Sequence, residues 1–209
     1  MESSDFTSTI RILANRWAAA GLLLPAFPLL ASGQPLGVDE IAEATGVDVD
    51  RVTQVLENAR CERDEDGRLI DLFGMTLSPT LHRLTIDGRV LFSCCALWAH
   101  VIPKLVDRTV TVESVDPSSR ELVQLSLSPD GVESASPAGT AATMAIASQK
   151  AVDADVCGAF CCHVRHFVSL ESAERFTAGS RARHVVDLVT LDNMANQLHQ
   201  EIRRTARVG

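Results

Sequence analysis

Two pairs of adjacent cysteines constrain the fold of this chain more than any other feature. They are Cys94-Cys95 and Cys161-Cys162, and they hold four of the six cysteines. Neighbouring side chains point to opposite faces of a strand and diverge by roughly 100° in a helix, so one thiol of each pair can face a common site. The fold must then bring two distant segments together. Because thiolate is the softest protein ligand, such a site suits Hg(II) or Cu(I).

Composition excludes several classes of function. The formal charge is −8 and no concentrated basic patch interrupts it, so we expect neither a nucleic-acid partner nor an anionic membrane partner. Six cysteines without regular disulfide spacing indicate reduced thiols in a cytoplasm. The apolar run 18–33 imitates a secretory signal, but Pro25 and Pro28 interrupt it and acidic residues precede it. We therefore expect a cytoplasmic protein, with no transmembrane helix.

Residues 36–80 carry the pattern of a winged helix. A short helix is predicted to end at Gly46, and either Asp48 or Asp50 can cap a second helix with one apolar face. A hairpin turn is then predicted at Asp66-Gly67. The second helix mixes acidic with basic residues, which is poor for phosphate contact. We expect residues 1–82 to form a winged-helix-like helical domain that serves as scaffold.

Residues 83–209 are expected to form a mixed β-sheet domain with flanking helices, which makes the fold class α+β. The predicted elements are a strand or tight turn leading into a helix over 90–106, strands over 109–114 and 122–128, a helix over 137–150, a strand over 156–168 that carries the second cysteine pair, a helix capped by Ser169, a strand over 185–189 and a helix over 191–206.

Several short motifs in register resemble the organomercurial (alkylmercury) lyase family. They are Cys95-Ala96-Leu97, Leu-Ser-Leu-Ser-Pro at 125–129, Pro-Ala-Gly at 137–139 and Phe-Cys-Cys-His-Val at 160–164, and their order and spacing match over residues 85–170. The resemblance implies protonolysis of a carbon–mercury bond. One thiolate would bind mercury, a second thiol would weaken the bond to carbon, and a proton would reach the departing group. A hydrocarbon leaves, Hg(II) remains as bound product, and no cofactor is required.

The resemblance also implies roles for individual thiols. Cys95 and Cys161 match the family's two essential cysteines, and they are the candidate catalytic and mercury-binding residues. Cys94 and Cys162 are then expected to face elsewhere, although either could help to hand on the product ion. The implied partners are an organomercury small molecule, small thiols, and mercuric reductase as an acceptor of Hg(II).

Position 98 departs from the family. The family usually has an aspartate three residues after the first cysteine, where it would shuttle the proton, but this chain has Trp98. An indole can wall a substrate pocket but has no usable acid proton. Three alternatives stay open. The missing acid favours a non-enzymatic protein that holds Hg(II) or Cu(I), and Trp98 could shape the pocket of a lyase-fold relative recruited to another reaction. The third is a regulator or redox sensor that uses the winged helix, which the acidic second helix disfavours.

Overall fold

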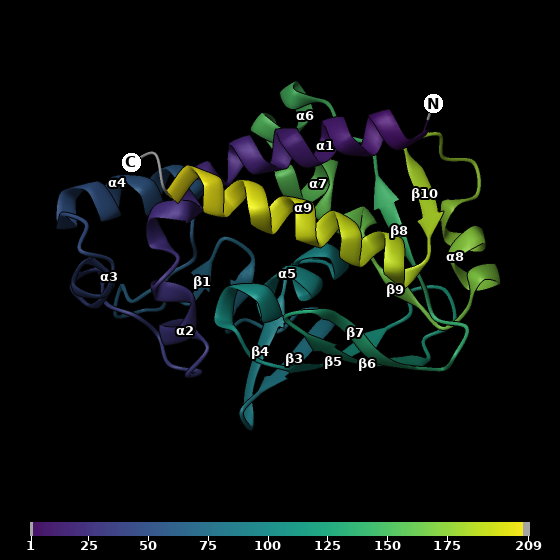
Figure 1. Cartoon of the computed structure of the whole chain (residues 1–209), viewed down its shortest axis with the longest axis horizontal. Coiled ribbons are helices and arrows are strands. Elements are labelled where there is room, and N and C mark those ends of the chain that lie inside the picture. Colours follow the sequence, from purple (N-terminus) through teal and green to yellow (C-terminus); the bar gives the residue numbers. More distant parts are fainter. Residues whose placement is uncertain (1, 207–209) are drawn as a thin grey trace.

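The structure is a computed structural model that describes residues 2–206. Two long helices, α1 and α9, cross the molecule on one side of a large sheet, and α5 lies between α9 and that sheet (Figure 1). The helices are α1 (Glu2–Arg16), η1 (Ala18–Leu23), α2 (Ala26–Leu30), α3 (Val38–Thr45), α4 (Val49–Ala59), α5 (Ala96–Val106), α6 (Gln149–Ala154), α7 (Val156–Ala159), η2 (Cys161–His163), α8 (Leu170–Thr177) and α9 (Leu188–Ala206), with η1 and η2 of the 3₁₀ type.

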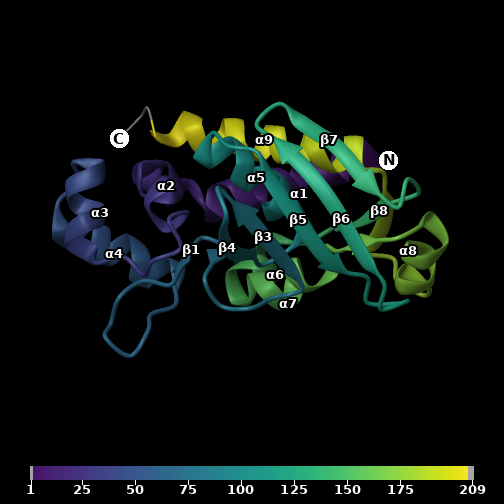
Figure 2. The ribbon, with the colours of Figure 1, turned by 90° about the horizontal axis from the view of Figure 1, so that it is seen from below.

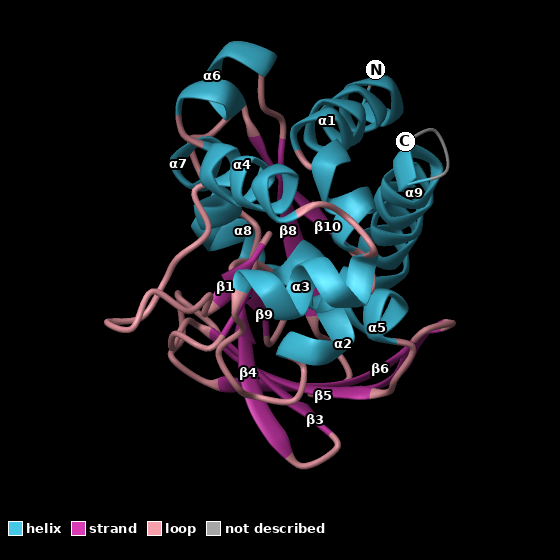
Figure 3. Cartoon of the chain, turned by 90° about the vertical axis from the view of Figure 1, so that its left-hand side faces the viewer, coloured by secondary structure: helices cyan, strands magenta, loops and turns pink. Residues whose placement is uncertain are grey.

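The N-terminal helices confirm the helical pattern expected there. Helix α3 ends where Gly46 adopts the left-handed conformation, and α4 begins at Asp48, whose side chain accepts a hydrogen bond from the backbone of Asp50. The apolar run 18–33 forms η1 and α2, which bury Leu23 and Phe27 completely. Helices α3 and α4 lie at the left-hand end of the molecule in Figure 1 and therefore face the viewer in Figure 3.

The large sheet is antiparallel and has seven strands in the order β1-β2-β4-β3-β5-β6-β7. Buried and more exposed residues alternate along β5, so one face of the sheet packs against the core and the other faces outward. Figure 2 shows the outward face from below, with the helices behind it. This arrangement confirms the α+β fold class. The strands of both sheets are β1 (Asp71–Leu72), β2 (Met75–Thr76), β3 (His82–Ile86), β4 (Arg89–Ser93), β5 (Val110–Val115), β6 (Leu122–Ser128), β7 (Gly131–Ser136), β8 (Ala141–Ala145), β9 (His166–Phe167) and β10 (Arg183–Val186).

Two predicted elements in the second half are wrong. The alanine-rich segment 137–150 holds strand β8, the central strand of the sheet β10-β8-β9, because every side chain of β8 is buried and pairing outweighs helix propensity. The predicted strand over 156–168 is instead α7, η2 and the two-residue β9. The strand β7 was not predicted. The helix capped by Ser169 and the terminal helix are confirmed as α8 and α9.

Within residues 2–206, no helix combines the length and apolar character that crossing a membrane requires.

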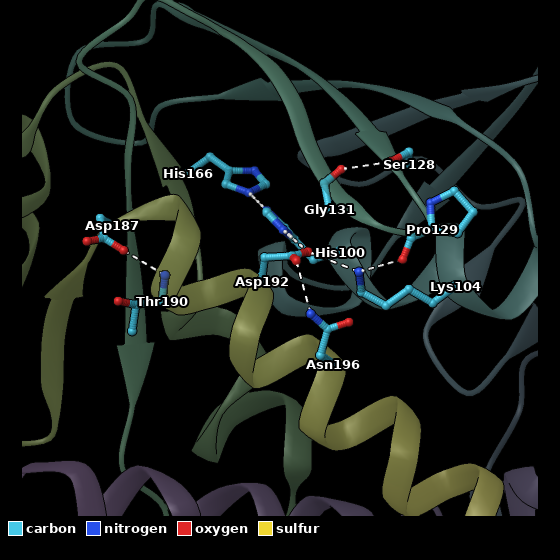
Figure 4. A network of polar contacts seen from close by, with 10 residues as sticks. All are labelled: His100, Lys104, Ser128, Pro129, Gly131, His166, Asp187, Thr190, Asp192 and Asn196. Carbon is cyan, nitrogen blue, oxygen red and sulfur yellow. Dashed lines mark hydrogen bonds and ion pairs between the residues drawn. The ribbon is translucent and has the colours of Figure 1, made fainter.

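A buried chain of polar side chains ties the sheet to α5 and α9. Its contacts are His82 Nδ1 to Ser114 Oγ at 2.8 Å, Ser114 Oγ to His166 Nδ1 at 3.0 Å, His166 Nε2 to His100 Nε2 at 3.3 Å and His100 Nδ1 to Asp192 Oδ1 at 3.3 Å. Figure 4 shows the end of this chain, where the ammonium of Lys104 also lies 3.2 Å from the Asp192 carboxylate. The network holds α5 in place against its neighbours.

Burial keeps these imidazoles neutral. It lowers the pKa of His82 to about 3, lowers that of His100, and lowers that of His166 well below its ordinary value. Asp71 has the opposite shift, because burial raises its pKa to about 7. Unfolding at mildly acidic pH therefore takes up protons at the histidines and releases one from Asp71.

We predict that the free energy of unfolding falls as pH drops from 6.5 to 4.5. In this window the unfolded histidines bind protons that the folded ones exclude, and each net proton is worth about 1.4 kcal/mol per pH unit. Urea denaturation across this range measures the slope. An Asp71→Asn variant should steepen it by about one proton, because the opposing group is gone. A pH-independent free energy would contradict the prediction.

Candidate active site

The first cysteine pair lies at the junction of β4 and α5. Cys95 has extended backbone and precedes the first helical residue. Two backbone hydrogen bonds fix this junction: Cys94 N–H donates to Gly74 O at 2.9 Å, and Ala96 N–H donates to Val164 O at 3.0 Å. The junction is therefore held between the β1–β2 turn and the segment that follows the second cysteine pair.

Cys161 comes from the short turn η2, which is anchored to the smaller sheet. Phe160 beside it is fully buried, and the hydroxyl of Thr143 on β8 donates to His163 O at 2.7 Å. Cys161 O in turn accepts a hydrogen bond from Val164 N–H at 3.2 Å. Buried apolar and backbone contacts, rather than a regular strand, aim this thiol inward.

The two segments bring three sulfurs together. The Sγ atoms of Cys94, Cys95 and Cys161 all lie within 4.8 Å of one another, and Cys94 Sγ is 3.8 Å from Cys95 Sγ and 3.7 Å from Cys161 Sγ. The expected meeting of Cys95 with Cys161 is confirmed. The expectation that Cys94 faces elsewhere is wrong, because side chains need not alternate where a strand turns into a helix.

The spacing of the three sulfurs suits one soft cation. Three bonds of about 2.3 Å, the length of zinc–thiolate bonds, would place sulfurs about 4.0 Å apart in a trigonal plane. Cys95 and Cys161 are buried and Cys94 is partly buried, so the cluster is largely shielded from water. We refer to Cys94, Cys95 and Cys161 as the thiol cluster.

The cluster is electrostatically asymmetric. Burial alone would raise the pKa of Cys95, but hydrogen bonds from Cys161 and Cys94 and the backbone amide of Trp98 outweigh it, so the pKa lies well below its ordinary value. Hydrogen bonds with Cys161 and Cys95, together with burial, raise the pKa of Cys94 well above its ordinary value. The hydrogen bond with Cys94 would lower the pKa of Cys161, but the hydrogen bond with Cys95, burial and the charge of Cys95 outweigh it, so this pKa is raised as well. Cys95 is thus the thiol of the cluster that ionises first.

A glycine makes the close approach of Cys94 and Trp98 feasible. Gly74 has φ +102°, a conformation that side chains disfavour, and a Cβ there would lie 2.8 Å from Cys94 Sγ and 3.1 Å from Trp98 Cδ1. Any larger residue at this turn would push against the cluster.

A cavity of about 220 Å³ is lined by Cys94 and Cys161 of the thiol cluster, whereas Cys95, which is completely buried, is not among its lining residues. Its wall combines apolar rings with charged groups. The lining residues come from α1, α4, β1, α7 and the turns beside them. The lining residues are Arg16, Trp17, Ala59, Arg60, Glu62, Asp71, Phe73, Gly74, Cys94, Val156, Cys157 and Cys161. Asp71 was not among the predicted site residues, and its only signal in the sequence is its place just before the buried residues Leu72 and Phe73.

Trp98 lies in the core behind this wall. The side chain is completely buried. Its ring makes an edge contact with the ring of Trp17, with 5.0 Å between centroids, and stacks on the ring of Phe27, with 6.4 Å between centroids. Among the residues that the structure describes, no group accepts a hydrogen bond from its Nε1. Trp98 supports Trp17, which lines the cavity, and its role as a substrate wall stays a prediction.

The other three cysteines lie outside the thiol cluster. Cys162 and Cys157 are exposed and their sulfurs are 3.3 Å apart. Cys61 at the end of α4 is partly buried, and burial raises its pKa to about 12. Its thiol is therefore unreactive at neutral pH.

Comparisons with known proteins agree with this arrangement. A family model described as "Alkylmercury lyase" matches residues 75–200, and one described as "Helix-turn-helix domain of alkylmercury lyase" matches residues 14–73. An alkylmercury lyase of Bacillus cereus is 32% identical over 186 residues, which cover 87% of this chain and 84% of the relative. One of Staphylococcus epidermidis is 36% identical over 154 residues, covering 73% and 69%.

A solved structure has the same fold. It is described as the mercury-bound form of MerB2, and it superimposes with a TM-score of 0.76 over 95% of this chain and 99% of that one, at 17% sequence identity. The family models together span both the helical lobe and the domain with the thiol cluster. The chain belongs to the alkylmercury lyase family.

Proposed function

We propose that this protein cleaves carbon–mercury bonds by protonolysis and keeps Hg(II) on its thiol cluster. The observation that carries the proposal is the meeting of three sulfurs, two of them buried, beside a cavity that Cys94 and Cys161 line, with the pKa of Cys95 held well below its ordinary value. The family supplies the reaction class.

The charge state of the cluster suits the first step. The thiolate of Cys95 bonds to the mercury of an organomercury cation and needs no prior loss of a proton. Binding draws the metal toward Cys161, whose sulfur lies within 4.8 Å of Cys95 Sγ. The substrate is thereby held at the buried end of the cavity.

The second step breaks the bond to carbon. As the sulfur of Cys161 bonds to mercury it loses its proton, the carbon–mercury bond breaks, and the carbon keeps the electron pair and gains one proton. Hydrocarbon leaves and Hg(II) stays on Cys95 and Cys161. The sulfur of Cys94 can become a third ligand and retain the ion until a small thiol, or mercuric reductase, takes it.

The cavity favours small organic groups. An apolar cavity of about 150 Å³ is large enough to bind benzene, and the volume here is about 220 Å³. The rings of Trp17 and Phe73 supply apolar wall, whereas charged residues at the opening meet water. Methylmercury and phenylmercury both fit these dimensions.

We predict that Cys95→Ser and Cys161→Ser each abolish tight Hg(II) binding and lower benzene release from phenylmercury by about 10²-fold or more, because a hydroxyl is a hard ligand and a poor acid. Benzene is measured in the presence of excess small thiol. Cys61→Ser is the matched control and should bind Hg(II) like the parent, since Cys61 is outside the cluster.

Two outcomes would count against this assignment. Equal Hg(II) binding by all three variants would indicate nonspecific thiol chemistry. Stoichiometric Hg(II) capture without benzene release would establish the second candidate, a soft-metal binding protein. The third thiol and the absence of a carboxyl at position 98 are the observations that favour this candidate.

A further inference from the structure

A second pair of thiols lies outside the thiol cluster. Cys157 on α7 and Cys162 on η2 have their Sγ atoms 3.3 Å apart, and both residues are exposed. The turn that carries Cys162 is tied down, because Arg165 Nε donates to Cys162 O at 3.2 Å. The side chain of Asp155 accepts a hydrogen bond from Gly158 N–H at 3.1 Å and so caps the short helix of Cys157.

The cavity connects this outer pair to the inner cluster. Cys157 lines the same cavity as Cys94 and Cys161, and Cys162 is the chain neighbour of Cys161. Within this one cavity Cys161 is buried and Cys157 is exposed. The thiol cluster and the outer pair are thus the inner and outer ends of one path.

We propose that Cys157 and Cys162 form a second, solvent-facing site for soft thiophilic cations, which takes up Hg(II) as it leaves the thiol cluster. The proposal rests on the proposed function for the source of the ion. Thiolates are the ligands that such ions prefer, and two exposed side chains can rotate to the separation that two-coordinate binding needs.

The transfer is a ligand exchange without electron transfer. Two bonds from mercury to the outer sulfurs form while the bonds to the inner sulfurs break. The two outer thiols release two protons, and the vacated inner sulfurs or the solvent accept them. Burial and the neighbouring sulfur of Cys162 raise the pKa of Cys157 to about 11, so it stays protonated until metal displaces the proton.

Anaerobic titration of the fully reduced chain with HgCl₂ against a monothiol competitor tests the site. The parent should retain one equivalent of Hg(II) more than either the Cys162→Ser variant or the Cys157→Ser variant. The Cys61→Ser variant should retain as much Hg(II) as the parent. The Cys95→Ser variant should still retain the one equivalent of Hg(II) that binds at Cys157 and Cys162. The double variant Cys95→Ser/Cys162→Ser should not retain it. Equal retention by the parent and the Cys162→Ser variant overturns the proposal.

A kinetic experiment separates this site from the proposed function. After a single turnover of phenylmercury, Cys162→Ser should release benzene as the parent does but pass Hg(II) to an external dithiol about tenfold more slowly, as when a supporting ligand is lost. Unchanged transfer overturns the relay. Absence of benzene from the parent would overturn the proposed function, whereas the titration would still report the outer site.

A different observation points to a proton donor. The carboxyl of Asp71 lines the cavity together with Cys94 and Cys161. Its Oδ2 accepts a hydrogen bond at 3.3 Å from the backbone N–H of Gly74, the residue that packs against Cys94. In the described part of the cavity wall, Asp71 and Glu62 are the carboxyl groups.

We infer that Asp71 is the acid that replaces the missing carboxyl at position 98, an assignment that also rests on the proposed function. Its carboxylic acid, the form present below a pH of about 7, gives its proton to carbon as the carbon–mercury bond breaks. The carboxylate that is left takes the proton that Cys161 loses on bonding to mercury, so Asp71 ends each cycle as it began. Burial, aided by the charge of Glu62, outweighs the hydrogen bonds from the backbone of Gly74 and from the thiol of Cys61 at the end of α4 and raises the pKa of Asp71 to about 7. This value suits Asp71 to both directions of proton transfer.

Removing the acid should slow the chemistry and spare binding. Asp71→Asn should lower the rate of benzene release by about 10²–10⁴-fold, the usual effect of a positioned general acid, with Hg(II) retention unchanged. Asp71→Glu should restore part of the rate. Glu62→Gln is the matched control on the same wall. At low pH its rate of benzene release should equal the parent's rate. The pH above which this rate declines should be lower than in the parent, because the pKa of Asp71 falls when the charge of Glu62 is removed.

The outcomes are distinct. Parental rates in a folded Asp71→Asn protein overturn the assignment and leave the proposed function intact. A Glu62→Gln profile that coincides with the parent's profile also overturns it, because a merely structural Asp71 would not carry the pH dependence. No benzene from the parent overturns both.

Discussion

The site depends on the junction at which β4 becomes α5. Its two backbone hydrogen bonds, from Cys94 to Gly74 and from Ala96 to Val164, join three parts of the chain that are distant in sequence. Because backbone groups make these contacts, they fix the backbone from which Cys94 and Cys95 project. The buried histidine network holds the body of α5 from the other side, so the helix that begins at the thiol cluster has little freedom to shift.

The residue types at positions 94 and 98 fit this packing. The side chain at 98 points from the first turn of α5 into an aromatic core, where an indole is buried among Trp17 and Phe27. A carboxylate in that place would be desolvated without a partner. The small side chain at 94 meanwhile occupies the space that Gly74 leaves, and there a thiol reaches both other sulfurs.

Pattern alone could predict the winged-helix-like helices and the strands β5 and β6, because caps and alternation are local signals. The meeting of Cys95 with Cys161 was predicted from the cysteine pairs together with the resemblance of the short motifs to the family. Pattern alone could not predict β8 or the turn that carries Cys161. In β8 the alanines are buried between two strands, and that contact is non-local. Cys94 was misjudged because the alternation of side chains applies within an element and fails at the boundary between two elements.

Asp71 shows why a proton donor is harder to find in a sequence than a metal ligand. Soft-metal binding demands particular atoms at particular distances, so thiols recur in short motifs. Proton transfer demands only an acid within reach and a suitable pKa, and burial can supply that pKa to a carboxyl on any element that borders the cavity. In this chain, the turn Asp71–Gly74 closes against Cys94. Loss of an acid at one position therefore leaves the reaction available to a chain whose neighbouring turn brings another.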